Sequence, residues 1–272
     1  MIKKAFIIFL FSLFSFSYNG LGKTQDNEKQ SELTVEADDS LEWFEKEQYY
    51  VAKGNVILKK EGFTLKANFV RANYITENGE NVLKNIIAKN NVILTKEQTK
   101  ATGQLMTYDL DKKIAIITGS FQTLKSPSGY VESKKIIKYD DLENKAEAEG
   151  TVKVILSNKT VIFADKINAN LNERDKSIKT AIAKGNVKIE NKIKGNNSKA
   201  DLGIYDSSTE IIKLSGNVVL TNSDSKVSGA SGETNLNTGI STIISNPNKK
   251  ERVKGVFLPR KKVKNGENNW II

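Results

Sequence analysis

Histidine and cysteine are both absent from this chain of 272 residues, which also has only 3 prolines and 2 methionines. Their absence excludes Ser-His-Asp triads, cysteine nucleophiles, zinc fingers, disulfide scaffolds and any metal site built on His or Cys. We therefore expect no metal site and no cofactor. Hydrophobic residues make up 38% of the chain, which is few for a thick core but too many for a wholly disordered protein.

Positive charge is concentrated near the C-terminus rather than spread over the body of the chain. The formal net charge is +10, but residues 249–264 hold a dense run of lysine and arginine that only Glu251 opposes. Residues 23–248 are close to neutral. A nucleic-acid-binding protein is expected to spread Lys and Arg along a groove or face of its folded body. We therefore expect no nucleic acid among the partners.

Residues 1–22 have the three-part pattern of a secretory signal peptide. Lys3 and Lys4 form a basic start, residues 5–16 are apolar apart from two serines, and small and polar residues follow up to Lys23. The apolar run is shorter than the roughly 20 residues that a membrane-spanning helix needs. The pattern predicts export to the periplasm with cleavage near Gly20–Gly22, and an uncleaved membrane anchor is the alternative.

A short phrase recurs along the body of the chain, and repeats of this kind indicate a stacked architecture. The copies are AKGNVIL from Ala52, AKNNVIL from Ala88, ITGSFQT from Ile117, AEGTVKV from Ala148, AKGNVKI from Ala183 and LSGNVVL from Leu214. The glycine of each copy, an asparagine in the second, gives markers at positions 54, 90, 119, 150, 185 and 216. Four of these markers follow an aromatic residue at a constant distance, namely Trp43, Tyr108, Tyr139 and Tyr205.

The repeats favour strands rather than helices. Apolar and polar residues alternate after most markers, Val, Ile, Thr and Tyr are frequent, and turn-forming clusters such as 77–80 separate the runs. A glycine that opens a run suits a residue with positive φ, or a bulge that redirects the strand. Beyond the signal peptide there is no convincing helical stripe, so the sequence predicts an all-β fold.

One repeat cannot bury its own apolar face, but stacked repeats can do so by forming two facing sheets. Residues two and four positions after each marker should then point between the sheets. The predicted interior residues are Leu33 and Val35 ahead of the first repeat, then Val56, Leu58, Val92, Leu94, Phe121, Val152, Val154, Val187, Ile189, Val218 and Leu220. A solidly packed interior would only stabilise the fold, whereas splayed sheets would leave these side chains lining an apolar groove.

Neighbouring carboxylates are the sequence's candidates for catalysis, because glycoside hydrolysis uses a pair of them. Asp109, Asp140 and Asp206 each follow a tyrosine marker directly and therefore recur with the repeat, whereas a catalytic site should be unique. Asp38 and Asp39 lie outside this phase and have no further support. We expect these carboxylates to serve in turns or face solvent, and we expect no catalytic residue.

Several stretches resemble the OstA-like family. They are TVEADDSLEWFEKEQYYVAKGNVILKKEGFTLKANFVRANY at 34–74, ATGQLMTYDLDKKIAIITG at 101–119 and VESKKIIKYDDLENKAEAEG at 131–150, with RVKGVFLP at 252–259 as a terminal strand. Their order and phase, together with the signal peptide, carry the resemblance. It implies a repetitive antiparallel β-jelly roll that is slightly open, with two facing sheets.

The resemblance also implies a role in lipopolysaccharide transport. A periplasmic bridge of this family would carry lipopolysaccharide from the inner to the outer membrane, with the acyl chains of lipid A against the interior residues named above. It would join similar domains of the inner- and outer-membrane components by end-to-end strand addition, and the same edges would permit self-association. The sequence has no phosphate-binding loop, so the driving work would come from a partner.

Two other functions stay open at this point. One is a secreted structural β-solenoid without a lipid ligand, and the other is the inner-membrane-anchored receptor of the same transport system. The chain is longer than the usual family member, so we expect OstA-like repeats at 33–155 and additional repeats that continue the same roll at 156–245. A terminal strand and basic tail would follow at 246–264, with a disordered end at 265–272. A fusion of two OstA-like units is the alternative organisation.

Overall fold

The structure is a computed structural model, and it describes residues 33–60, 62–127, 129–156, 159–191, 195–235, 238, 241–245 and 252–258. The predicted signal peptide and the predicted disordered end at 265–272 lie outside these residues. Within the described ranges, no helix is both long enough and apolar enough to cross a membrane.

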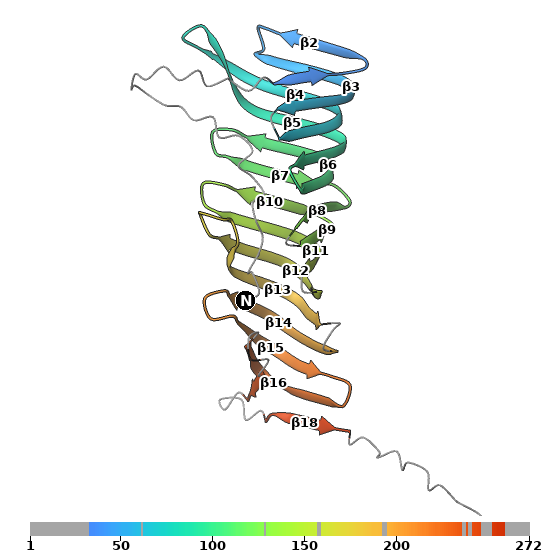
Figure 1. Cartoon of the computed structure of the whole chain (residues 1–272), viewed down its shortest axis with the longest axis vertical. Helices are drawn as coiled ribbons and strands as arrows, with labels where there is room; N and C mark the ends of the chain where they lie inside the picture. Colours follow the sequence, from blue (N-terminus) through green and yellow to red (C-terminus); the bar gives the residue numbers. More distant parts are fainter. Residues whose placement is uncertain are drawn as a thin grey trace, which may run out of the picture.

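The regular elements of the described ranges are antiparallel β-strands stacked along one long axis, which confirms the predicted fold class (Figure 1). The N-terminal strands are β1 (Thr34–Glu36), β2 (Ser40–Phe44), β3 (Tyr49–Lys60), β4 (Phe63–Glu77), β5 (Glu80–Lys96) and β6 (Thr99–Asp109). The middle strands are β7 (Ile114–Thr118), β8 (Gln122–Ser126), β9 (Gly129–Ser133), β10 (Ile136–Asp140), β11 (Lys145–Leu156) and β12 (Thr160–Leu171). The C-terminal strands are β13 (Ile178–Asn191), β14 (Asn196–Asp206), β15 (Ile211–Thr221), β16 (Ser225–Asn235), β17 (Ser241–Ile244) and β18 (Lys254–Phe257).

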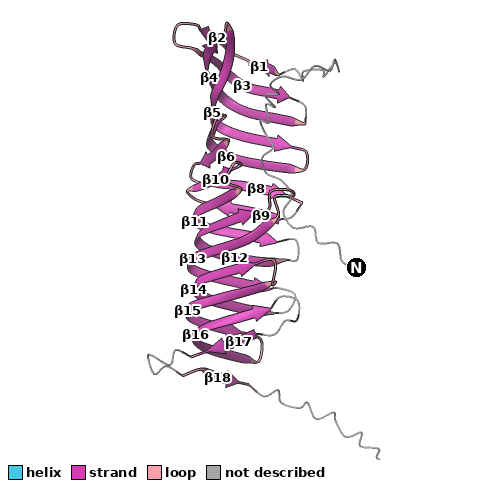
Figure 2. Ribbon diagram, turned by 90° about the vertical axis from the view of Figure 1, so that its left-hand side faces the viewer, coloured by secondary structure: helices cyan, strands magenta, loops and turns pink. Residues whose placement is uncertain are grey.

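The long strands bend near their middle, so the hydrogen-bonded ladder folds into two arms (Figure 2). β6 pairs with β7 through one arm and with β8 through the other. β11 likewise pairs with β10 on one side of its bend and with β9 on the other. We call the arm that contains β2, β7, β10 and β17 sheet A, and the arm that contains β1, β8, β9 and β18 sheet B. Each long strand contributes one half to each sheet.

The bend coincides with the recurring Gly-Asn phrase. Gly185 and Asn186 have φ values of 73° and 48°, and the strand register shifts there because these two residues face one residue of each neighbouring strand. Glycine and asparagine adopt this left-handed backbone at the lowest cost. Asn186 also donates a hydrogen bond to Asp165 across the bend at 2.9 Å, and Asn217 repeats the contact with Asp201 at 2.8 Å. Consecutive positive φ values recur at Gly54-Asn55, Asn90-Asn91, Gly150-Thr151 and Gly216-Asn217, as predicted for the markers.

The core lies in the angle between the two sheets and becomes thinner toward the C-terminus. The largest cluster of buried side chains comes mainly from β3 to β7, with Tyr139 of β10 and Leu171 of β12. A smaller cluster of five buried residues, Ala164, Val187, Ala200, Leu214 and Val218, serves the C-terminal strands. The ladder continues from β11 through β12 to β13, so its hydrogen bonding is unbroken across residue 155.

Candidate functional site

The interior residues nearest the bend are buried along the whole roll. Val56, Val92, Val152, Val187 and Val218, each two positions after a marker, are at most 2% exposed. Full burial of such an aliphatic side chain contributes about 1.5–3 kcal/mol. These valines hold the bend together and present no surface to a ligand in this conformation.

The residues four positions after each marker differ between the two halves of the roll. Leu58 and Leu94 are buried in the N-terminal half, whereas Val154, Ile189 and Leu220 are only half-buried. The inner apolar surface is therefore closed around β3 to β5 and partly accessible from β11 onward. Val154, Ile189 and Leu220 pack against the buried clusters of this half and keep part of their surface exposed. We use the name inner groove for the strip of inner surface formed by these three residues.

Side-chain volume on the inner face accounts for this difference. In the N-terminal half, the bulky side chains of Phe63, Met106 and Tyr108 point inward and are buried. In the C-terminal half, Ile189 and Leu220 share the small Ser198 as their inner-face neighbour. A serine side chain fills less space between the sheets than these bulky side chains do, so Ile189 and Leu220 keep part of their surface accessible.

The prediction that Phe121 points inward is wrong, because its side chain is 48% exposed. At the other markers two residues form the bend, but here the three residues Gly119, Ser120 and Phe121 separate β7 from β8. One additional residue transfers the following side chains to the opposite face of a strand. Gln122 therefore takes the inward position that was predicted for Phe121.

Gln122 is a buried polar residue that the sequence pattern did not predict. It is 0% exposed, and neither amide atom has a hydrogen-bond partner within the described residues. Its cross-strand neighbour Ser133 is also buried, but the Ser133 hydroxyl donates to the carbonyl oxygen of Glu149 at 2.6 Å. The only signal in the sequence is the loose match of ITGSFQT to the repeat.

Leu33 and Val35 are not buried, contrary to the prediction for interior residues. Leu33 lies ahead of β1 and is 39% exposed, and Val35 is 36% exposed. Val35 pairs with Leu58 and therefore points to the same inner face. However, β1 is the outermost strand of sheet B at the N-terminal end of the roll, and no described residue packs beyond it. Its exposure therefore follows from its place at the open end of the roll.

A polar cluster around Asp141 lies where the closed half of the interior meets the open half. Asp141 stands in the turn between β10 and β11, and Lys176 from the next turn of sheet A pairs with its Oδ1 atom at 3.0 Å. The Tyr139 hydroxyl donates to the same oxygen at 2.9 Å. Burial raises the pKa of Tyr139, and the hydrogen bond and charge of Asp141 raise it further.

The charge of Asp141 also influences the pKa values of Lys96 and Tyr108. Lys96 ends β5 in sheet B, where burial lowers the pKa of its amine and the charges of Glu97 and Asp141 oppose that shift. Asp141 also acts on Tyr108, whose pKa is raised to about 12 mainly by burial.

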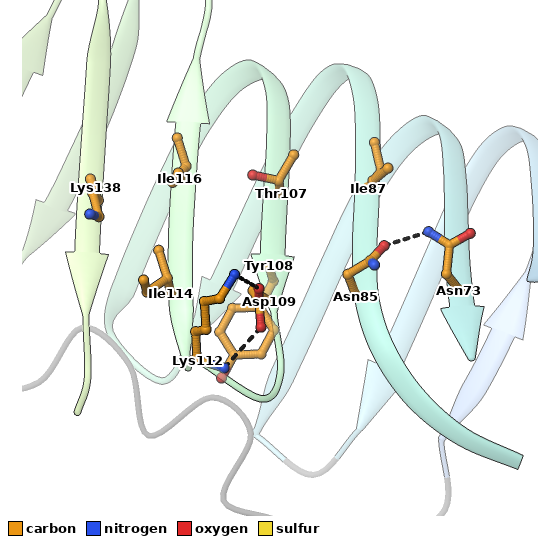
Figure 3. Close-up of a pocket in the computed structure, with 10 residues that line it drawn as sticks. All are labelled: Asn73, Asn85, Ile87, Thr107, Tyr108, Asp109, Lys112, Ile114, Ile116 and Lys138. Atoms are coloured by element: carbon orange, nitrogen blue, oxygen red, sulfur yellow. Dashed lines mark hydrogen bonds and ion pairs between the residues drawn. The ribbon is translucent and has the colours of Figure 1, made fainter. Parts of the chain in front are cut away.

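A separate pocket of about 470 Å³ lies on the outer face of sheet A (Figure 3). Its lining residues are Asn73, Asn85, Ile87, Thr107, Tyr108, Asp109, Lys112, Ile114, Ile116 and Lys138. Asp109 accepts a hydrogen bond from the backbone amide of Lys112 at 2.9 Å, and its second oxygen lies 3.3 Å from the Lys112 amine. Asp109 thus serves in the turn, as predicted. No group of three or more potential metal ligands occurs in the described part of the chain.

The two ends of the roll expose apolar side chains and strand edges. At the N-terminal end Leu41 is 61% exposed, and β2 pairs with β3 alone among the described strands. At the other end Phe257 is 70% exposed, and β18 pairs with β16 alone within the same ranges. Each end therefore offers free backbone donors and acceptors beside apolar surface.

The comparison with protein families matches the chain twice. The model of the LptA/(LptD N-terminal domain) LPS transport protein family covers residues 34–141 and 130–240. No curated protein matches the chain. A crystal structure of LptH, described as the LptA-homologous periplasmic component of the lipopolysaccharide transport device of Pseudomonas aeruginosa, is 11% identical and covers 86% of this chain and 100% of that one. Its TM-score of 0.22 is too low for the likeness to carry an argument.

The family assignment rests on the two matches, which together cover most of the described roll. The fold agrees with them, because it is an antiparallel β-roll whose strands bend at the recurring Gly-Asn positions. The chain belongs to the LptA/LptD N-terminal domain family of lipopolysaccharide transport proteins.

Proposed function

We propose that this protein is a periplasmic bridge that binds lipopolysaccharide and carries it from the inner to the outer membrane. The observation that carries the proposal is the inner groove, where Val154, Ile189 and Leu220 are half-buried on the inner face of a continuous roll. An acyl chain that enters the groove gains about 0.8 kcal/mol for each CH₂ group removed from water. Hydrophobic contact is not directional, so a chain can move between equivalent repeats without crossing deep energy wells.

The bridge would be completed by similar domains at both ends. The free edges of β2 and β18 offer the unpaired backbone groups that strand addition requires. The exposed Leu41 and Phe257 would be covered in such a joint. Inner- and outer-membrane components with domains of this family are the proposed partners, and the same edges permit self-association.

We propose that residues 33–155 and 156–245 act as one continuous roll. The support is the unbroken pairing of β11, β12 and β13, which gives an acyl chain one path rather than two. Transport rather than catalysis is the proposed activity, with the driving work supplied by a partner. The periplasmic location depends on residues 1–22, and N-terminal sequencing of the mature protein separates a soluble bridge from an anchored receptor.

Mass spectrometry of lipid that co-purifies with the periplasmic protein tests the proposal. We expect lipopolysaccharide with the unchanged chain and much less with Leu220→Asp, because a carboxylate in the groove repels acyl chains. Ile204→Asp is the matched control, because Ile204 is 39% exposed and lies on the outer face of sheet A, beside Lys213 and away from the groove. Absence of lipid from the unchanged protein would support the structural β-solenoid without a lipid ligand. The closed interior around β3 to β5 favours this alternative for the N-terminal half of the roll.

A further inference from the structure

The outer face of sheet B is strongly basic. Strand alternation places nine lysines there, distributed from one end of the roll to the other: Lys59, Lys66, Lys100, Lys125, Lys153, Lys188, Lys199, Lys226 and Lys254. The carboxylates on the same face are Glu36, Glu132 and Glu190. They pair with Lys59, Lys153 and Lys188, respectively. The remaining lysines give this face an excess of positive charge.

The outer face of sheet A is balanced, so the basic bias is specific to one side of the molecule. Its cations are Lys53, Arg71, Lys89, Lys138, Lys145, Lys166, Lys184 and Lys213, and its carboxylates are Glu42, Asp109, Asp140, Glu147, Glu149, Asp206 and Glu233. Several of them form ion pairs, such as Lys53 with Glu42 at 2.8 Å and Lys166 with Glu147 at 2.6 Å. General solubility would not require the two faces to differ in this way.

Two pairs of lysines on sheet B face each other directly across neighbouring strands. Lys100 of β6 is opposite Lys125 of β8, and Lys188 of β13 is opposite Lys199 of β14. Like charges at directly opposed positions destabilise a sheet. Within the described residues, Lys100, Lys125 and Lys199 have no carboxylate in ion-pair range. These facing lysines do not stabilise the fold. A bound anion would be attracted to both lysines of a pair and would offset the repulsion between them.

We infer that the outer face of sheet B holds the anionic headgroup of the lipid whose acyl chains occupy the inner groove. This inference rests on the proposed function and adds the side of the roll on which the headgroup lies. Lys100 is the second residue of β6, and Lys125 is the last but one of β8. Both therefore lie near the strand ends of sheet B that are farthest from the bend. A phosphate group that projects out from between the two sheets reaches these strand ends first. The other lysines of the face provide further positions along the direction of transport.

The test compares a double variant, Lys100→Gln with Lys125→Gln, against Lys184→Gln with Lys213→Gln on the outer face of sheet A. Both double variants remove the same charge from exposed strand positions. The probes are micelles of phosphorylated lipid A and of dephosphorylated lipid A, and binding of the full mature chain is measured at fixed salt. Replacement of Lys100 and Lys125 should weaken binding of the phosphorylated lipid about thirty-fold. It should leave binding of the dephosphorylated lipid unchanged, and the control should bind both lipids as the unchanged protein does.

A second readout shows that the sheet B variant is folded. Removal of facing like charges should leave its thermal midpoint equal to that of the unchanged chain or higher. Equal losses in both double variants, or no loss in either, would overturn the inference about the headgroup while leaving the groove intact. If the unchanged protein bound neither lipid, the proposed function itself would be contradicted, and this inference with it.

Discussion

At the scale of single residues, the interior combines aliphatic side chains with one polar side chain that has no partner. Val56, Val152 and Val218 fill the bend, and Gln122 occupies the equivalent place where the repeat is irregular. A buried amide without hydrogen bonds costs about 1–3 kcal/mol for each unsatisfied group. Gln122 is therefore the residue of the interior that lowers the stability of the roll most clearly.

Replacement of this amide by an apolar side chain should stabilise the protein. We expect Gln122→Leu to raise the free energy of unfolding by about 1–2 kcal/mol, because the leucine fills the same space without unpaired polar atoms. Urea unfolding followed by circular dichroism measures the change. Thr95→Val, on the outward face of β5, is the control and should change stability little. A less stable Gln122→Leu protein would show that the amide is satisfied in solution.

Buried tyrosines should make the fold sensitive to alkali. The pKa of Tyr108 is raised to about 12, mainly by burial, so the fold favours the neutral phenol. Because the folded pKa lies above the unfolded value of about 10, this stabilisation is complete below pH 10 and is lost as the pH rises through about 12. Ultraviolet titration should show late ionisation that coincides with unfolding. Tyr108→Phe should remove part of the late signal, and ionisation of all tyrosines near pH 10 in a folded protein would disagree with this account.

At the scale of strands, the bend is the element that the repeat encodes. Two residues in left-handed backbone turn β3, β5, β11, β13 and β15 from sheet A into sheet B, and in β13 and β15 an Asn–Asp hydrogen bond closes the bend. A Cβ atom on Gly185 would lie 2.3 Å from Asp165 Oδ2, whereas a Cβ atom on Gly195 would meet nothing within 4 Å. Both glycines have positive φ, so an alanine at either position strains the backbone. Only at Gly185 would the added methyl group also clash with a neighbouring side chain, so comparison of the two variants distinguishes the steric effect from the backbone strain.

Alanine at these two positions should therefore have unequal effects. Gly195→Ala should cost about 1–2 kcal/mol of unfolding free energy, from the left-handed backbone alone. Gly185→Ala should cost about 2–3 kcal/mol, because Asp165 must also move and lose its bond to Asn186. Chemical denaturation of both variants measures the difference. Equal losses would show that the bend tolerates a side chain.

The sequence predicts the regular repeats better than the positions where the repeat is irregular. The period of the Gly-Asn phrase was sufficient to predict all-β repeats, positive φ at the markers and the buried valines two residues later. It failed at Phe121, because a single additional residue in the bend changes the face and leaves little trace in the pattern. It also missed the basic face of sheet B. Net charge along the chain does not show which lysines alternate onto the same side, and the register that pairs Lys100 with Lys125 comes from the fold.

At the scale of the whole molecule, the two halves of the roll should differ in stability. The N-terminal strands share the largest buried cluster, and the C-terminal strands share a small one lined partly by glycine. In stacked repeats each unit depends on its own packing and on its neighbours. Amide hydrogen exchange should therefore be slowest in β3 to β6 and faster in β14 to β16. Uniform protection along the roll, or the reverse order, would contradict this gradient.

The central claim is that the inner groove receives an acyl chain while the rest of the interior stays packed. Photo-crosslinking in living cells tests it most directly, with the photoreactive residue placed in turn at Ile189, Leu220, Val56 and Ile204, which is exposed on the outer face of sheet A. We predict lipopolysaccharide adducts at Ile189 and Leu220, and none at Val56 or Ile204. Adducts at none of the four positions, or at Ile204 as strongly as at Leu220, would contradict the account.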